Sequence, residues 1–287
     1  MARRPWRRSA IRLLVALAMA GVSWVSLSPA ARAADAVTEI KLDAPPRVGP
    51  AHGTLLIVGG GNMGKLWPLF LELAGGKDAP IVVIPTAGEG PEPEAKAAET
   101  LRAHGATNVT VLHTRDRAMA DREDFTEPLR TARAVWFEGG RQWRLVDVYL
   151  RTRTQKEIWA LLERGGLVGG SSAGATIQGS YLVRGAPEGN QIMMSPGHEE
   201  GFALLRDTAI DQHVNTRKRA DDLRPVLKVH PALLGIALDE ATAIVVSGDR
   251  CEVAGAGTVR FLASADAPAV ELTAGGRYDL AARKRAP

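Results

Sequence analysis

The sequence predicts an α/β fold built on a doubly wound, mostly parallel sheet, with antiparallel strands near the C-terminus. From Gly53 onward, short apolar runs alternate with longer amphipathic runs, and this alternation is typical of βαβ units. The apolar runs carry little internal polarity, as expected of strands that are buried on both faces. After Asp239 the runs become short and are separated by turns, which indicates antiparallel pairs.

The elements follow from these runs in chain order. Strands are expected at residues 55–58, 81–84, 109–112, 134–137 and 167–168. Helices are expected at residues 63–74, 91–104 and 146–164. Antiparallel strands are expected at residues 243–246, 251–254, 259–262 and 269–272.

The first 33 residues are typical of a secretory signal peptide. Five arginines precede the apolar run 13–27, and Ala31-Arg32-Ala33 matches an A-x-A cleavage pattern. The apolar run is short for a membrane span and contains two serines, so cleavage near Ala33 is favoured over a stable membrane anchor. We therefore expect an exported protein, periplasmic or extracellular.

Charge and cysteine content exclude several classes of function. The whole chain carries a net charge of +4, but residues 1–33 hold six arginines and no acidic residue, which leaves −2 for the remainder. This balance gives no reason to expect nucleic acid or an anionic membrane as a partner. Because Cys251 is the single cysteine, an intramolecular disulfide and a cysteine-based metal site are excluded. We expect no metal and no organic cofactor.

The run Gly-Gly-Ser-Ser-Ala-Gly-Ala at residues 169–175 contains a Gly-x-Ser-x-Gly pattern centred on Ser172. It follows an apolar strand and precedes a helix-compatible run, as in a sharp strand-to-helix turn that exposes a serine hydroxyl. At such a turn the free N–H groups of the helix N-terminus can stabilise an oxyanion. Small-residue turns that only pack helices show the same pattern, so the motif alone leaves both interpretations open.

Glycine-containing segments follow four of the expected strands, at residues 59–61, 85–88, 138–140 and 169–172. In a parallel sheet these carboxyl ends meet at one edge, where ligands bind. The spacing Gly59-x-Gly61-x-x-Gly64 also fits a dinucleotide-binding loop. That interpretation is disfavoured, because residues 84–87 are Ile-Pro-Thr-Ala where the acidic residue of that motif is expected.

A serine nucleophile needs a base. Of the six histidines, His213 is the strongest candidate, because the run 210–215 turns abruptly from apolar to polar, as where a strand ends in a site. His198 lies in a loop on the expected substrate side.

These residues resemble the cyanophycinase branch of the S51 serine peptidases. The resemblance rests on Asp211-Gln212-His213, Arg217, Arg219, the run 235–243, Gly139-Gly140-Arg141-Gln142 and the run 170–175, in the family's order over about residues 53–248. It implies a class I glutamine amidotransferase-like fold and hydrolysis of peptide bonds by serine. The family's best-known members release β-aspartyl-arginine from cyanophycin, a poly-aspartate with arginine on its side-chain carboxyls.

The resemblance also implies roles for individual residues. Ser172 matches the nucleophile, His213 the general base and Glu240 the carboxylate that orients the base. The N–H groups of Ala173 and of Gly139 or Gly140 would form the oxyanion hole. The residues that would line the substrate cleft are Gln142, Asp211, Arg217, Arg219 and Arg141. The chain order Ser, His, acid argues against an α/β-hydrolase, in which the acid precedes the histidine.

Two positions depart from the family's pattern. Arg141 stands where better-known members carry aspartate, and Asp222 stands roughly where they carry a further arginine. Both changes bear on whether the pocket accepts arginine-bearing units, since Arg141 would repel a guanidinium or recruit a carboxylate. The triad positions are unaffected.

The resulting organisation is a signal peptide at 1–33, an arm at 34–52, a cyanophycinase-like hydrolase domain at 53–248 and a β extension at 249–287. The expected function is hydrolysis of a cyanophycin-like aspartyl-arginine polymer, with a peptide or polypeptide substrate and a homodimer as the assembly. Two alternatives stay open, an aspartyl dipeptidase of the same family and a non-catalytic binding protein on the same fold. A closed cap formed by residues 185–201 would favour the dipeptidase.

Overall fold

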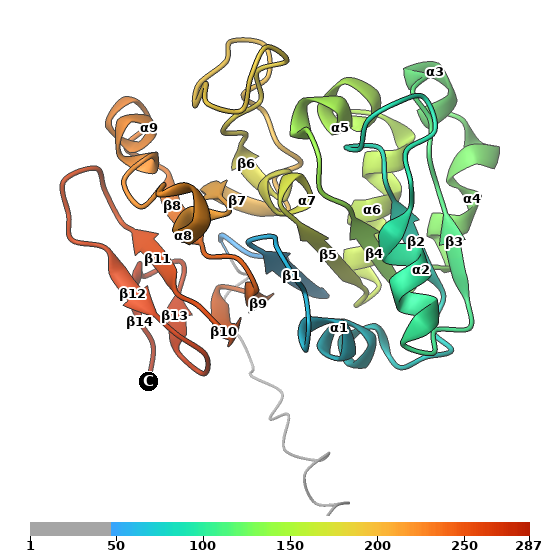
Figure 1. The fold of residues 1–287 in the computed structure, drawn as a ribbon, viewed down its shortest axis with the longest axis horizontal. Coiled ribbons are helices and arrows are strands. Elements are labelled where there is room, and N and C mark those ends of the chain that lie inside the picture. Colours follow the sequence, from blue (N-terminus) through green and yellow to red (C-terminus); the bar gives the residue numbers. More distant parts are fainter. Residues whose placement is uncertain (1–46) are drawn as a thin grey trace, which may run out of the picture. The chain divides into compact units, whose positions relative to one another are not determined.

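The computed structural model describes residues 47–287 (Figure 1). The predicted signal peptide of residues 1–33 lies outside the described residues, and so does the predicted arm up to residue 46. The last part of that arm contacts the C-terminal region, because the N–H groups of Arg47 and Val48 donate to the Asp249 carboxylate at 3.0 and 2.7 Å. Within residues 47–287, no helix has the length and apolar character needed to cross a membrane.

Strands and helices alternate through the first half of this region, and strands dominate the second half. The strands are β1 Thr54–Val58, β2 Ile81–Ile84, β3 Val109–Val111, β4 Ala134–Phe137, β5 Leu167–Ser171, β6 Gly179–Tyr181, β7 Leu205–Asp211, β8 Leu234–Leu238, β9 Thr242–Ser247, β10 Arg250–Gly255, β11 Val259–Leu262, β12 Val270–Leu272, β13 Arg277–Asp279 and β14 Lys284–Arg285. The helices are α1 Leu66–Ala74, α2 Lys96–Ala103, α3 Arg117–Ala120, α4 Glu123–Thr131, α5 Gln142–Tyr149, α6 Arg153–Glu163, α7 Ala173–Thr176, α8 Val214–Arg217 and α9 Leu223–Val229.

The first sheet has the order β14-β13-β10-β9-β1-β5-β4-β2-β3. Strands β1, β5, β4, β2 and β3 pair in parallel, and β9 joins the edge of β1 in the antiparallel sense. The prediction of a mostly parallel sheet with C-terminal antiparallel strands is therefore confirmed.

The sheet is covered on both faces, as the apolar strands predict. Side chains alternate along a strand, so Leu55 and Ile57 of β1 enter one core while Leu56 and Val58 enter the other. Helices α5 and α6 pack into the first core, and α1 and α2 pack into the second. Both faces of β1 are thus buried, which explains why its sequence has no polar alternation.

A second sheet has the order β12-β11-β8-β7-β6, with β6, β7 and β8 parallel and β11 and β12 antiparallel. The antiparallel strands predicted at 259–262 and 269–272 are β11 and β12 of this second sheet, whereas β6, β7, β8, β13 and β14 were not predicted. Strands β9 and β10 form a hairpin with Ser247 opposite Arg250, so the predicted division after residue 248 runs through its turn.

Three predicted helices differ from those observed. The helix predicted at 146–164 is two helices, α5 and α6, because the chain turns at Arg151, which has a left-handed φ of 60°. The helix predicted at 91–104 begins only at Lys96, after Pro91 and Pro93. The helix predicted at 63–74 begins at Leu66. Helices α3 and α4 were not predicted.

Candidate active site

The carboxyl ends of the parallel strands lie at one edge of the first sheet. In the register of the sheet, Val58 of β1 pairs with Ser171 of β5, and Phe137 of β4 pairs with both Gly170 and Ile84. The glycine-containing segments that follow these strands therefore begin side by side. This edge carries the residues described below.

Ser172 occupies a strained turn between β5 and α7. Its φ and ψ are 56° and −113°, a conformation that costs a non-glycine residue about 1–3 kcal/mol. The flanking glycines permit the turn by close packing: a Cβ on Gly170 would lie 2.3 Å from the Gly174 carbonyl oxygen, and one on Gly174 would lie 2.2 Å from the Phe137 carbonyl oxygen. The Ser172 N–H donates to the Val58 carbonyl at 3.1 Å. The pattern Gly-x-Ser-x-Gly thus has a geometric cause.

His213 lies two residues beyond β7, and its ring faces the serine. The distance from His213 Nε2 to Ser172 Oγ is 2.9 Å. The backbone N–H of His213 donates to the Gly59 carbonyl at 2.8 Å, which connects the loop after β7 to the end of β1. Burial lowers the pKa of His213, and the hydrogen bond with Glu240 partly opposes this shift. The imidazole therefore remains neutral, and able to accept a proton, at pH values at which a free histidine would already be protonated.

Glu240 follows β8 and holds the other ring nitrogen of the histidine. Its Oε1 lies 2.5 Å from His213 Nδ1 and also accepts from Thr216 Oγ1 at 3.0 Å. The Glu240 N–H donates to Asn215 Oδ1 at 3.0 Å. The hydrogen bond with His213 lowers the pKa of Glu240, so the carboxylate stays charged and favours the tautomer with the proton on Nδ1.

The loop Gly59–Gly61 packs against His213 and Glu240. A Cβ on Gly60, which has a φ of 103°, would lie 2.3 Å from His213 Cε1. A Cβ on Gly61 would lie 2.7 Å from Glu240 Oε2. The glycines of the dinucleotide-like pattern therefore make room for the histidine and the glutamate, and this geometry gives them a role within the site.

The residues expected to form the oxyanion hole also lie next to Ser172. Ala173 follows it at the start of α7, and a Cβ on Gly139 would lie 3.2 Å from Ser172 Cβ. Gly140 has a φ of 142° and packs against the Ala87 carbonyl oxygen, where a Cβ would lie at 2.1 Å. Among the residues that the structure describes, the N–H groups of Ala173, Gly139 and Gly140 have no hydrogen-bond acceptor. They are free to serve a developing oxyanion.

The residues expected to line the substrate cleft divide into buried and exposed groups. Gln142, Asp211 and Arg219 are buried, with exposed fractions of 2%, 0% and 2%. Gln142 donates to the Val183 carbonyl at 2.8 Å, and Asp211 receives two hydrogen bonds from Arg184. These contacts support the walls of the site, and direct contact of the three side chains with substrate stays a prediction.

Arg217 and Arg141 are more accessible. Arg217 is exposed at the end of α8, and its charge favours the neutral form of His213. Arg141 is half-buried and donates to the Ala186 carbonyl at 2.5 Å. Asp222, the second departure from the family pattern, accepts a hydrogen bond from Arg184 at 2.5 Å.

The sequence analysis missed three residues of this region. Asn215 and Thr216 hold Glu240, and Arg184 pairs with both Asp211 and Asp222. The sequence offered a weak signal for Arg184, a single charged residue after the buried pair Leu182-Val183. For Asn215 and Thr216 the only signal is that they follow the histidine.

An acidic cavity of about 540 Å³ opens beside the serine. It is lined by Gly88, Glu89, Glu92, Pro93, Glu94, Lys96, Glu138 and Gly139. Gly139 thus belongs both to this cavity and to the surroundings of Ser172. Burial raises the pKa of Glu138 to about 7, although its carboxylate accepts the Ala97 N–H at 2.7 Å. We call this space the acidic cavity.

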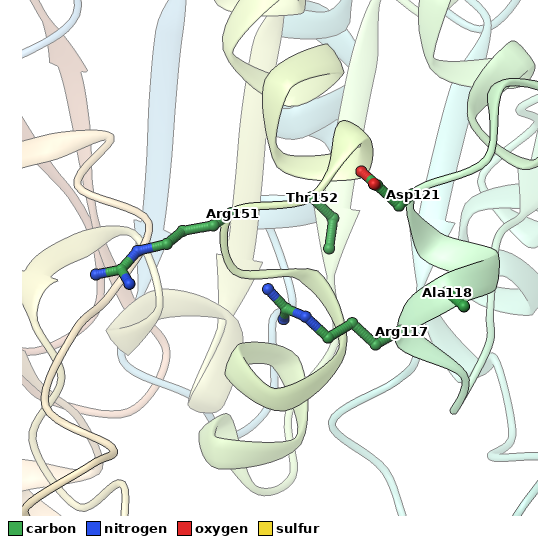
Figure 2. Close-up of a pocket in the computed structure, with 5 residues that line it drawn as sticks. All are labelled: Arg117, Ala118, Asp121, Arg151 and Thr152. Atoms are coloured by element: carbon green, nitrogen blue, oxygen red, sulfur yellow. The ribbon is translucent and has the colours of Figure 1, made fainter.

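A second hollow, of about 420 Å³, lies between α3 and the turn that joins α5 to α6 (Figure 2). Its charged side chains are engaged within the protein: Arg117 donates to the Leu150 carbonyl at 2.5 Å, Arg151 pairs with Glu200, and Asp121 accepts the Arg153 N–H at 2.6 Å. This hollow shares no lining residue with the serine site.

In residues 47–287, no three His, Cys, Asp or Glu side chains are grouped so as to hold a metal ion.

The chain belongs to peptidase family S51. The model of that family matches residues 54–254, which run from the start of β1 into β10 and contain all the site residues described above. The fold is that of the class I glutamine amidotransferase-like proteins. Members of this family are serine-type peptidases, and the protein is therefore a peptidase of this type.

Its relatives include cyanophycinases. It is 31% identical to the cyanophycinase of Geminocystis herdmanii over 221 residues, which cover 74% of this chain and 80% of that protein. It is 30% identical to the cyanophycinase of Synechococcus elongatus over 203 residues, which cover 67% of this chain and 59% of that protein. The crystal structure of a peptidase from an acI-B1 actinobacterium is similar in fold, with a TM-score of 0.61, 24% identity, and coverage of 79% of this chain and 97% of that one.

Proposed function

We propose that this protein hydrolyses a cyanophycin-like aspartyl-arginine polymer to β-aspartyl-arginine dipeptides, with Ser172 as the nucleophile. The observation that carries the proposal is the continuous hydrogen-bond chain from Ser172 Oγ through His213 to Glu240, at 2.9 and 2.5 Å. A base within hydrogen-bond reach of the nucleophile, itself oriented by a third group, is the arrangement required for nucleophilic catalysis by serine.

Each step of the proposed reaction has a residue whose position supports it. Ser172 Oγ attacks the carbonyl carbon while His213 Nε2 takes its proton, and Glu240 stabilises the imidazolium that forms. The N–H groups of Ala173 and Gly139 receive the negative charge on the carbonyl oxygen. The C–N bond then breaks as His213 protonates the leaving amine, and water hydrolyses the acyl-enzyme with His213 again acting as base.

The acidic cavity supports an arginine-bearing substrate. Its lining includes Gly139, which packs against Ser172, and four glutamates, of which Glu94 pairs with Lys96 at 3.1 Å. A guanidinium would find carboxylate partners there, in the two-bond geometry that arginine favours. From the sequence alone, Arg141 is expected to repel such a group. The Arg141 guanidinium donates instead to the Ala186 carbonyl, and Ala186 does not line this cavity.

The aspartyl dipeptidase remains the second candidate within the family. The sequence analysis named the loop of residues 185–201 as the feature that distinguishes the two, since a closed cap favours short peptides. Most residues between 187 and 200 are partly or fully exposed, which is compatible with a polymer reaching Ser172.

The first experiment measures release of β-aspartyl-arginine from cyanophycin by the protein. Ser172→Ala and an α-aspartyl dipeptide are tested in parallel. Release that depends on Ser172 supports both the residue assignment and the substrate. Turnover of the dipeptide alone retains the triad and moves the function to a dipeptidase. Absence of turnover of both, together with no labelling of Ser172 by a serine-reactive probe, revives the binding-protein alternative.

Export and assembly are part of the same proposal. We propose cleavage near Ala33 and a periplasmic or extracellular location, on the pattern of residues 1–33. Mass spectrometry of the N-terminus of the secreted protein tests the cleavage position. A homodimer is tested by light scattering of the purified protein.

A further inference from the structure

Arg184 is a buried cation beside the candidate active site, in the chain that follows β6. Its side chain is 1% exposed, and its φ of 58° is a left-handed conformation that a non-glycine residue rarely adopts. Such a conformation persists only where the surrounding contacts hold it in place.

All three guanidinium nitrogens of Arg184 are engaged. Nε and Nη2 donate to the two carboxylate oxygens of Asp211 at 2.8 and 2.9 Å. Nη2 also donates to Asp222 Oδ2 at 2.5 Å, and Nη1 donates to the Asn190 carbonyl at 2.8 Å. One side chain therefore joins the end of β7, the start of α9 and the loop of residues 185–201.

Asp211 connects this guanidinium to the base. It is the last residue of β7, it is fully buried, and its Oδ1 also accepts the N–H of Gln212 at 2.9 Å. His213 directly follows Gln212 in the sequence. A displacement of Asp211 therefore displaces the backbone that carries the imidazole.

The residues near Arg184 in the sequence contact the loop that carries the expected oxyanion donors. The Val183 carbonyl accepts from Gln142 Nε2, and the Ala186 carbonyl accepts from Arg141 Nη2. Gln142 and Arg141 directly follow the oxyanion glycines. The short segment 183–186 thus contacts both the loop that carries the base and the loop that carries the oxyanion donors.

We propose that Arg184 is a positioning residue of the peptidase. Through Asp211 it sets the place of His213 relative to Ser172, and through Asn190 it ties that geometry to the loop of residues 185–201. The inference rests on the proposed function, because it requires Ser172 and His213 to be the reacting pair. A buried ion pair often contributes little net stability compared with apolar packing, which leaves geometric specification as its role here.

The test measures the rate at which a fluorophosphonate probe labels Ser172 in the full chain. This reaction reports the activation of the serine by its base and needs no peptide substrate. Arg184→Met removes the charge at similar length. Arg184→Lys keeps a charge that can pair with Asp211 but loses the two-bond fork. The matched control is Asp222→Asn, which alters the half-exposed partner of the same guanidinium and leaves both bonds to Asp211 intact. Circular dichroism and thermal unfolding establish that each variant is folded.

We expect Arg184→Met to label more slowly than wild type by about tenfold or more, because a displacement of the base of the order of 1 Å is costly. Arg184→Lys should label at an intermediate rate, and Asp222→Asn within about twofold of wild type, a difference that corresponds to only about 0.4 kcal/mol in the barrier. If Arg184→Met fails to fold, the labelling rate of Arg184→Lys alone tests the proposal.

Two results overturn the inference. A folded Arg184→Met or Arg184→Lys that labels at the wild-type rate shows that the guanidinium only stabilises the fold. A decrease for Asp222→Asn as large as that for Arg184→Met shows that the pair with Asp211 is not the operative one. The proposed function fails separately: wild-type protein that is not labelled, or Ser172→Ala that is labelled equally, removes Ser172 as the nucleophile and this inference with it.

Discussion

Gly60→Ala is the substitution whose effect follows most directly from the geometry of the site. A Cβ at this position would lie 2.3 Å from His213 Cε1 and 2.7 Å from His213 Nε2. Carbon atoms in contact are separated by about 3.5 Å or more, so the imidazole would have to move by more than about 1 Å. The 2.9 Å contact with Ser172 would then be lost.

The expected result is a loss of catalytic rate without loss of the fold. A displacement of about 1 Å at a reacting group costs on the order of a hundredfold in rate. The matched control is Gly64→Ala in the same loop: Gly64 also has a positive φ, of 44°, but a Cβ there meets no atom within 4 Å. Both variants place a Cβ at a positive φ, which costs roughly 1–2 kcal/mol or more, whereas only Gly60→Ala brings that Cβ against the histidine.

The assay compares the rate of Ser172 labelling by a fluorophosphonate probe with the midpoint of thermal unfolding. Gly60→Ala should label about a hundredfold more slowly than Gly64→Ala at a similar unfolding midpoint. A folded Gly60→Ala protein that labels as fast as wild type would show that the packing of this loop against His213 does not set the position of the base.

Three further results are expected. Because burial lowers the pKa of His213, the acidic limb of kcat/KM should have its midpoint below 6.5, the ordinary value; a midpoint above 6.5 contradicts a neutral, buried base. Glu240→Gln should reduce kcat by about 10²–10⁴-fold. It should also move that midpoint lower still, since the hydrogen bond that His213 donates to Glu240 raises the pKa of His213. An unchanged pH profile would exclude the pairing seen here. Because the pKa of Glu138 is about 7, KM for an arginine-bearing substrate should rise as the pH falls through 7 and Glu138 becomes neutral. Glu138→Gln should show a high KM at every pH, whereas Glu163→Gln, at the end of α6 and outside the acidic cavity, should behave as wild type.

Local sequence was sufficient to predict the strands of the first sheet that are buried on both faces. The strands at 55–58, 81–84 and 134–137 match β1, β2 and β4 to within one residue, because burial on both faces demands an uninterrupted apolar run. Helix boundaries were less accurate: the left-handed turn at Arg151 has no strong local signal, and the signal of Pro91 and Pro93 before α2 was not used. Strands β6, β7 and β8 were missed because their pairing is decided by partners distant in the chain.

The candidate site divides in the same way. The sequence by itself indicated Ser172 and the glycines around it, because a tight turn requires those residue types at fixed spacing. It also offered His213 as the strongest candidate base, whereas Glu240 was indicated only by the resemblance to the family. Only the tertiary structure decided that Gly60 and Gly61 pack on His213 and Glu240, and that Glu138 lines the acidic cavity. It alone joined Arg184 to Asp211 across 27 residues of chain. The physical reason is that a buried charge must find its partner in space, and nothing in the neighbouring residues states which partner that is.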